Sequence, residues 1–133
     1  MAETEIKIEF SIYHDSTLDH DEITKIMHFE PTLTYNNGDQ VRENLVRKES
    51  AWIYSTEYIR SLYLDPILES IIQRIEPNII PLSEYVRKYG LSSKFDIVLR
   101  IGNDQPPSYY LPKRFIHICS KLNADIDTDI YIL

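Results

Sequence analysis

IKIEFSIY, residues 6–13, decides the fold, because apolar and more polar side chains alternate along its whole length. A period of two is typical of a β-strand with one buried and one exposed face. The segment therefore predicts a sheet whose one face meets the core, while the other meets water or a partner. Four further segments are predicted as strands: TLTY (32–35), SAWIYST (50–56), KFDIVLRI (94–101) and DIDTDIYIL (125–133).

Helices are predicted where apolar residues recur at spacings of three and four. The first is expected after Asp19, whose side chain is a suitable N-cap, with Glu22 three residues later as in a capping box. Its apolar face would carry Ile23, Ile26 and Met27. This helix follows the first strand and is expected to cover its apolar face.

Proline and glycine punctuate the other helices. In the second helix, Asp65 is expected to cap and Pro66 to take the first helical position, and the helix is expected to stop at Glu76-Pro77. A shorter helix is predicted from Pro81 to Gly90. The last helix has an apolar stripe formed by Phe115, Ile118, Cys119 and Leu122.

The order of these elements predicts an α+β fold. We expect one compact domain over residues 1–133, with a mixed, mainly antiparallel sheet and helices packed on one face. Apart from the extra short helix before the fourth strand, the first six elements match a ferredoxin-like βαββαβ order, and a C-terminal helix and strand extend it.

The segment FEPTLTYNNGDQ, residues 29–40, contains one of only three glycines in the chain. We expect residues 31–50 to form a hairpin or excursion that turns at residues 36–39, with Gly38 at positive φ. Leu33 and Tyr35 are expected to lie against the domain near Trp52. The excursion would then roof the core.

Composition narrows the classes of function. The formal net charge of −7 disfavours binding to nucleic acid, because that affinity depends mostly on neutralising phosphates. The one basic cluster, RENLVRK at 42–48, is interrupted by an acidic residue. A basic protein is therefore the better partner, and the sequence leaves the oligomeric state open.

Three features of the sequence bear on the expected cellular location. No apolar run approaches the length of about 20 residues that spans a bilayer, so membrane insertion is not expected. The N-terminal residues lack the pattern of a secretory signal. The single cysteine, Cys119, cannot form an internal disulfide. A cytoplasmic protein is expected.

No pattern indicates a catalytic, cofactor or metal site. Asp125, Asp127 and Asp129 would share one strand face and could hold a hard cation, but a calcium loop needs a turn glycine and a further ligand. The four histidines lack metal-ligand spacing, and a Cys-His pair would need His14, His20 or His28 brought to Cys119 by the fold. Burial of an inert Cys119 is the simpler expectation. We expect a protein that is not an enzyme and carries no cofactor.

Several of these features together resemble a known family. They are the alternating first strand, LDHDEITKIMHFEPT at 18–32, the TYNNGD turn at 34–39, the Trp that follows, and LNADIDTDIYI at 122–132. In order and spacing this chain resembles the bacterial domain-of-unknown-function family 4279 over nearly its whole length. The resemblance implies a bacterial origin, a small stand-alone protein and an immunity-like role, and it brings no enzymatic activity.

Two hypotheses of function remain open. The first is a non-catalytic protein-interaction module that presents an acidic, Tyr-rich surface, since the chain has ten tyrosines and exposed tyrosine is enriched in recognition surfaces. The second is a small-molecule binder or unrecognised hydrolase with a pocket near Trp52, Tyr35 and an acid such as Asp39. The candidate interaction residues are Glu9, Tyr35, Asp39, Trp52, Tyr54, Asp96, Tyr109, Tyr110, Asp125, Asp127 and Asp129.

Overall fold

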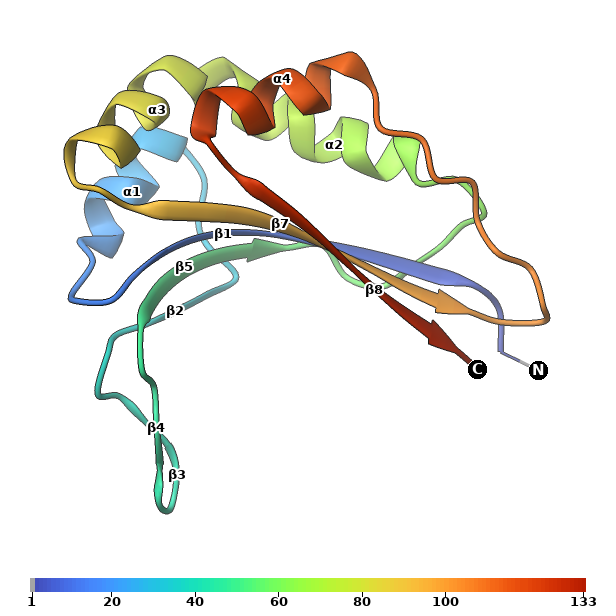
Figure 1. Cartoon of the computed structure of the whole chain (residues 1–133), viewed down its shortest axis with the longest axis horizontal. Helices are drawn as coiled ribbons and strands as arrows, with labels where there is room; N and C mark the ends of the chain where they lie inside the picture. Colours follow the sequence, from blue (N-terminus) through green and yellow to red (C-terminus); the bar gives the residue numbers. More distant parts are fainter. Residues whose placement is uncertain (1) are drawn as a thin grey trace.

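A layer of helices lies across one face of a mainly antiparallel sheet in the computed structural model, which describes residues 2–133 (Figure 1). The alternating segment that opens the sequence is β1 (Glu5–His14), and it lies in the middle of the sheet. The sheet order is β2 (Leu33–Tyr35), β5 (Ser50–Ser55), β1, β7 (Ser92–Ile101) and β8 (Asp125–Ile132), and the short β6 (Ile59–Arg60) also pairs with β1.

All of these strand pairs are antiparallel except β7 with β8. Those two are parallel because α4 (Lys113–Leu122) carries the chain back across the sheet between them. The α+β class with a mainly antiparallel sheet is confirmed. The ferredoxin-like order stays a prediction, since β6 and a two-stranded hairpin interrupt the expected succession.

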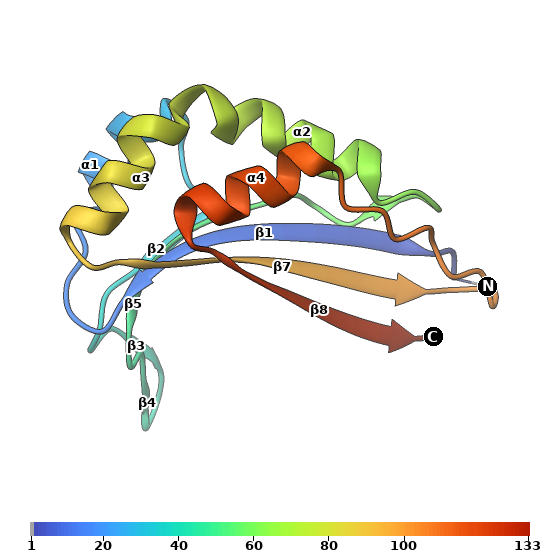
Figure 2. The same ribbon diagram turned by 45° about the horizontal axis from the view of Figure 1, so that its top comes forward.

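The other helices are α1 (His20–Met27), α2 (Asp65–Ile75) and α3 (Ile79–Lys88), and they lie on the same side of the sheet as α4 (Figure 2). Asp19 caps α1 as predicted, because its carboxylate accepts a hydrogen bond from the backbone N–H of Glu22 at 3.1 Å. None of the helices in residues 2–133 combines the length and apolar character needed to cross a membrane.

The predicted starts of α2 and α3 were wrong, whereas the predicted end of α2 at Glu76-Pro77 is confirmed. Leu64 is the N-cap of α2 rather than Asp65, and its carbonyl accepts from the N–H groups of Ile67 and Leu68. Pro77 lies in a 3₁₀ turn, η1 (Glu76–Asn78), which follows the end of α2 at Ile75 and leads directly into α3. Helix α3 begins at Ile79, two residues before Pro81. Proline is compatible with the first turn of a helical segment, where its missing N–H has no partner to lose.

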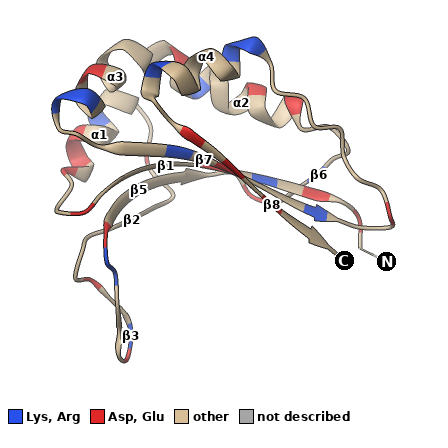
Figure 3. Ribbon diagram, viewed as in Figure 1, with Lys and Arg blue, Asp and Glu red and all other residues tan. Residues whose placement is uncertain are grey.

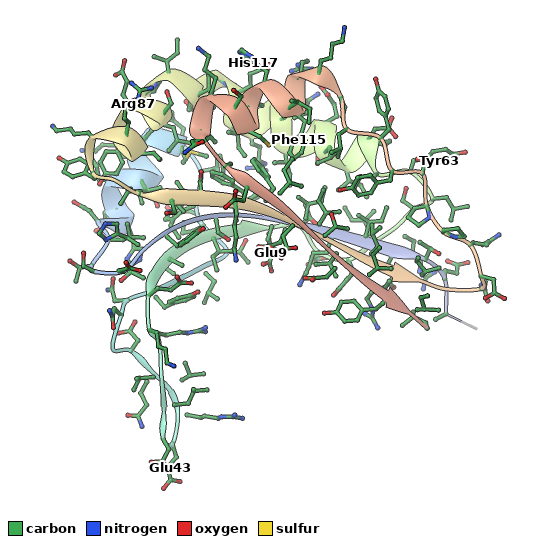
Figure 4. All side chains as sticks on the ribbon, in the orientation of Figure 1. Glu9, Glu43, Tyr63, Arg87, Phe115 and His117 are labelled. Carbon is green, nitrogen blue, oxygen red and sulfur yellow. The ribbon has the colours of Figure 1, made fainter. Side chains whose placement is uncertain are left out.

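The core lies between the sheet and the helices. Alternate side chains of β1 and β7 fill it, and the ring centroids of Phe10 and Phe95 are 4.9 Å apart. Phe115 of α4 packs edge-on against Phe95 at 4.9 Å and points from the helix toward the sheet (Figure 4). The predicted stripe of α4 is buried, including Cys119.

The segment after β2 turns where it was predicted to turn, but it extends in a different direction. The turn at residues 36–39 is present, Gly38 has φ 93°, and the N–H of Asp39 donates to the carbonyl of Asn36 at 3.0 Å. The chain then forms a second hairpin of β3 (Gln40–Arg42) and β4 (Leu45–Val46), which projects away from the helices (Figure 1). We call residues 36–49 the arm.

The arm does not roof the core, which corrects that expectation. Thr34 is the β2 residue paired with Trp52, so Leu33 and Tyr35 point to the opposite face of the sheet from the Trp52 indole. Leu33 is 48% exposed as a result. A period of two places neighbouring side chains of a strand on opposite faces, and both apolar residues of β2 fall on the uncovered one.

Candidate interaction surface

The face of the sheet opposite the helices carries no layer of its own in residues 2–133. We call it the open face, and Figure 4 shows Glu9 on it, on the other side of the sheet from Phe115. Strand pairing identifies the side chains that share it. They are Leu33 and Tyr35 of β2; Ala51, Ile53 and Ser55 of β5; Arg60 of β6; Glu5, Lys7, Glu9, Ser11 and Tyr13 of β1; Ser92, Lys94, Asp96, Val98 and Arg100 of β7; and Asp125, Asp127, Asp129 and Tyr131 of β8.

Three carboxylates lie side by side across the open face. Glu9 pairs with Asp96 between β1 and β7, and Asp96 pairs with Asp127 between β7 and β8. We call these three residues the carboxylate ladder. Like charges directly opposite each other on neighbouring strands destabilise a sheet. The ladder is therefore an arrangement that folding alone does not favour.

Two lysines offset part of this repulsion. The Nζ of Lys7 is 3.5 Å from Oε1 of Glu9, and the Nζ of Lys94 is 3.8 Å from Oδ2 of Asp96. Both pairs are partly exposed, and ion pairs of this kind contribute little stability in water. The lysines lower the charge of the face but do not remove it.

The surroundings of Asp96 disfavour its ionised form. Burial raises the pKa of Asp96 above its ordinary value, and the neighbouring charges of Glu9, Asp127 and Asp129 raise it further. Lys94 acts in the opposite direction. Asp96, the middle residue of the carboxylate ladder, thus carries a negative charge that a bound cation would stabilise.

The three aspartates of β8 share one face, as their alternation predicted. All three are exposed, and within residues 2–133 none of them forms an ion pair. Figure 3 shows acidic residues along β8 and residues of both charges on the helices. The β8 side of the open face is therefore its acidic side.

Two basic side chains of the open face, Lys7 and Arg100, lie against the aromatic ring of Tyr58. The Nζ of Lys7 and the guanidinium of Arg100 each lie 4.8 Å from the ring centroid of Tyr58. Arg100 also pairs with Glu5 at 3.5 Å. These contacts hold Lys7 and Arg100 away from Asp125, and Lys94 is the cation that lies opposite Asp125 on β7.

A cleft opens where the arm meets the sheet. It has a volume of about 450 Å³ and is lined by Tyr35, Asp15, Glu49 and residues of the arm. The guanidinium of Arg47 lies over the Tyr35 ring at 3.9 Å. A smaller hollow of about 140 Å³ on the open face shares Tyr35 and Glu49 with this cleft. The concave surface thus continues from the arm to the carboxylate ladder.

Hydrogen bonds hold the base of the arm. The N–H of Gly38 donates to the carbonyl of Arg47, and the N–H of Arg47 donates to the carbonyl of Asp39, both at 2.8 Å. The carboxylate of Asp39 accepts from the N–H of Asn36 at 2.7 Å, so this candidate residue closes the turn. Glu43 lies at the far end of the arm (Figure 4).

Trp52 and Tyr54 lie on the helix side of the sheet. Trp52 is fully buried, and its indole N–H donates to Oγ1 of Thr24 at 3.0 Å. Phe29 packs edge-on against both rings, with centroids 5.8 Å from Trp52 and 5.0 Å from Tyr54. Trp52 and Tyr35, which the pocket hypothesis combines, therefore lie on opposite faces of the sheet.

Most of the chain is similar in sequence to a known protein family. The family profile described as "Domain of unknown function (DUF4279)" matches residues 4–133. This chain belongs to the DUF4279 family. No curated protein and no solved structure matched the chain.

In this DUF4279 chain, the remaining candidates lie away from the open face. Tyr109 and Tyr110 belong to the loop before α4, and they are 47% and 60% exposed. The hydroxyl of Tyr109 lies 2.8 Å from Oγ1 of Thr128, which points to the helix side of β8. Tyr109 thus contacts β8 from the helix side, opposite the face that carries the aspartates.

Two kinds of chemical group were considered from the sequence, the thiol of Cys119 and possible metal ligands. Burial raises the pKa of Cys119 to about 11, which makes its thiol a poor nucleophile at neutral pH. Across residues 2–133, no group of three or more His, Cys, Asp and Glu side chains has the geometry to hold a metal ion.

Two features of this DUF4279 chain were missed from the sequence. Phe29 joins the buried aromatic cluster, although it stands next to Glu30-Pro31 in a polar stretch. The arm exposes Val41, Leu45 and Val46, the last of which is 51% exposed. Asn44 has φ 64°, a turn conformation that asparagine tolerates, and apolar residues precede and follow it. This pattern was the sequence signal for the hairpin.

Proposed function

We propose that this protein is a non-catalytic interaction module that binds a basic segment of another protein on the open face. The observation that carries the proposal is the carboxylate ladder of Glu9, Asp96 and Asp127, three acids aligned on an uncovered surface. Residues aligned at a cost to folding are candidates for a role in binding.

The surroundings of the ladder support this function. The arm borders the open face and presents exposed apolar side chains, while the sheet presents charge. Interfaces combine such apolar anchors with charges that steer encounter. A cation bound between Asp96 and Asp127 would relieve their mutual repulsion, which gives the complex an electrostatic gain that the free protein lacks.

The test uses a defined cationic probe, an eight-residue peptide of alternating Lys and Val with a fluorescent label. Its affinity would be measured by fluorescence anisotropy at low and high salt. In the ladder variant, Glu9→Gln, Asp96→Asn and Asp127→Asn remove three charges without a large change of shape. We expect the affinity at low salt to fall about tenfold, with a weaker dependence on salt.

The matched control removes three charges from the helix layer, by Asp21→Asn, Glu22→Gln and Glu84→Gln. Both variants have the same net charge, so a difference between them reports the position of the charges. Equal affinity of the two variants, or absence of binding by the unmodified protein, would contradict the proposal. A small molecule that co-purifies in stoichiometric amount and occupies the cleft beside Tyr35 would favour the pocket hypothesis instead.

A further inference from the structure

Strand β8 leaves one of its edges open. It pairs with β7 on one side and is the last strand of the sheet in the described chain. Figures 1 and 2 both show β8 along the margin of the sheet, with α4 above it and no element along its outer side. The backbone N–H and C=O groups that point away from β7 are therefore available to another strand.

This edge has only part of the usual protection against strand addition. Proteins shorten their edge strands, or place charged residues, above all lysine, or proline in them, to prevent pairing with other chains. The opposite edge of the sheet follows that practice, because β2 has only three residues. By contrast, β8 has eight residues, DIDTDIYI, with neither lysine nor proline.

The two faces of β8 have different chemistry. Asp125, Asp127 and Asp129 lie on the open face, while Ile130 and Ile132 point to the helix side and are 59% and 78% exposed. An added strand would place its own alternate side chains beside these two rows. The complementary strand has cations on one face and aliphatic side chains on the other.

The same charges argue against a second copy of this chain as the occupant. Antiparallel pairing of two β8 strands would place both aspartate rows on one face of a continuous sheet, opposite each other. Like charges in that position are destabilising. The aspartates thus select against self-pairing and in favour of a basic strand.

We propose that β8 binds an extended segment of a partner protein by β-strand addition, with Lys or Arg of the segment alternating with aliphatic residues. The inference rests on the proposed function and names the form in which the basic partner binds. Backbone hydrogen bonds to β8 would supply affinity, and the aspartate row would supply specificity for cations.

The test uses three forms of the Lys-Val peptide: unmodified, N-methylated at every Lys, and N-methylated at every Val. Only alternate N–H groups of an added strand point to β8, so one methylated peptide keeps its hydrogen bonds and the other loses them. We expect one methylated form to bind about as well as the unmodified peptide and the other to bind at least about tenfold more weakly. Amide hydrogen exchange of β8 should slow when the unmodified peptide binds.

Equal affinity of the two methylated peptides, or unchanged exchange in β8, would overturn strand addition. If the unmodified peptide binds and depends on the carboxylate ladder in that case, the proposed function still stands. If it does not bind, both proposals fail. A dimer found by sedimentation that protects the β8 amides without peptide would show that a second copy is the occupant, and would also overturn the inference.

Discussion

The indole N–H of Trp52 donates a hydrogen bond to Oγ1 of Thr24 at 3.0 Å, and this bond joins β5 to α1. Trp52 is fully buried, so its N–H has no access to bulk water. A buried donor without a partner costs more free energy than the hydrogen bond itself contributes. The pair therefore helps to fix α1 on the sheet.

Replacement of Thr24 by valine removes the acceptor and keeps the shape of the side chain. We expect the free energy of unfolding to fall by about 1–3 kcal/mol, because the indole N–H is left without a partner. Urea denaturation followed by the fluorescence of the single tryptophan measures this change. Thr34→Val, at an exposed position, is the control and should have little effect. Equal stability of the two variants would show that the bond is dispensable.

Asp96→Asn should stabilise the protein at neutral pH. Because the pKa of Asp96 is raised in the folded state, the folded protein binds this proton more tightly than the unfolded chain. The ionised carboxylate is therefore a cost above the folded pKa, and the cost vanishes below the ordinary value of 3.8. We expect the melting temperature of the variant to be a few degrees higher at pH 7 and equal to that of the unmodified protein near pH 3. A gain that persists unchanged at low pH would have another cause.

Cys119 should react slowly with thiol reagents in the native protein. Its thiol is buried and its pKa is raised to about 11, so little of the reactive thiolate is present at neutral pH. We expect labelling at the rate at which the fold opens, and rapid labelling in denaturant. A Cys119→Ala variant with Ser120→Cys places a thiol at the adjacent, exposed position and should react quickly. Fast labelling of native Cys119 would reopen a nucleophilic role.

Gly102 and Gly38 should differ in their tolerance of alanine. A Cβ at Gly102 would collide with the backbone carbonyl of Ala2, so Gly102→Ala should cost about 1–3 kcal/mol and displace the N-terminal segment. Gly38 has open space around it but φ of 93°, so Gly38→Ala should cost about 1–2 kcal/mol through backbone strain alone. Urea denaturation gives both values, and amide exchange near Thr4 should rise only in the Gly102 variant. An unchanged stability of Gly102→Ala would contradict the close approach.

The arm should contribute little to the free energy of unfolding of the protein. Leu45 is exposed on the arm, so Leu45→Ser should change the free energy of unfolding by less than about 0.5 kcal/mol. Leu68 of α2 is fully buried, and Leu68→Ser is the matched control, which should lose at least about 2 kcal/mol. Thermal denaturation of both variants compares them directly. A large loss in Leu45→Ser would mean that the arm supports the fold.

Much of the fold could be predicted because its signals are local. The alternation in residues 6–13 identified β1 and both of its faces, and the carboxylate of Asp19 identified the start of α1. The same alternation placed Asp125, Asp127 and Asp129 on one face of β8. Each of these signals depends on side-chain geometry within a single segment.

The errors arose where a local signal competed with packing. Pro81 predicted the start of α3, but the helix begins two residues earlier, at Ile79, directly after the 3₁₀ turn that contains Pro77. Leu33 and Tyr35 were expected to contact the core because they are apolar. The pairing of Thr34 with Trp52 placed both on the open face instead.

The sequence by itself determined the four helices and the strands β1, β2, β5, β7 and β8, and which side chains of each of these strands share a face. Only the tertiary structure decided that Asp96 lies between Glu9 and Asp127, that the arm projects away from the helices, and that the outer edge of β8 is free. The physical reason is that periodicity is a property of one segment, whereas the neighbour of a strand and its register depend on how all the segments pack together on one core.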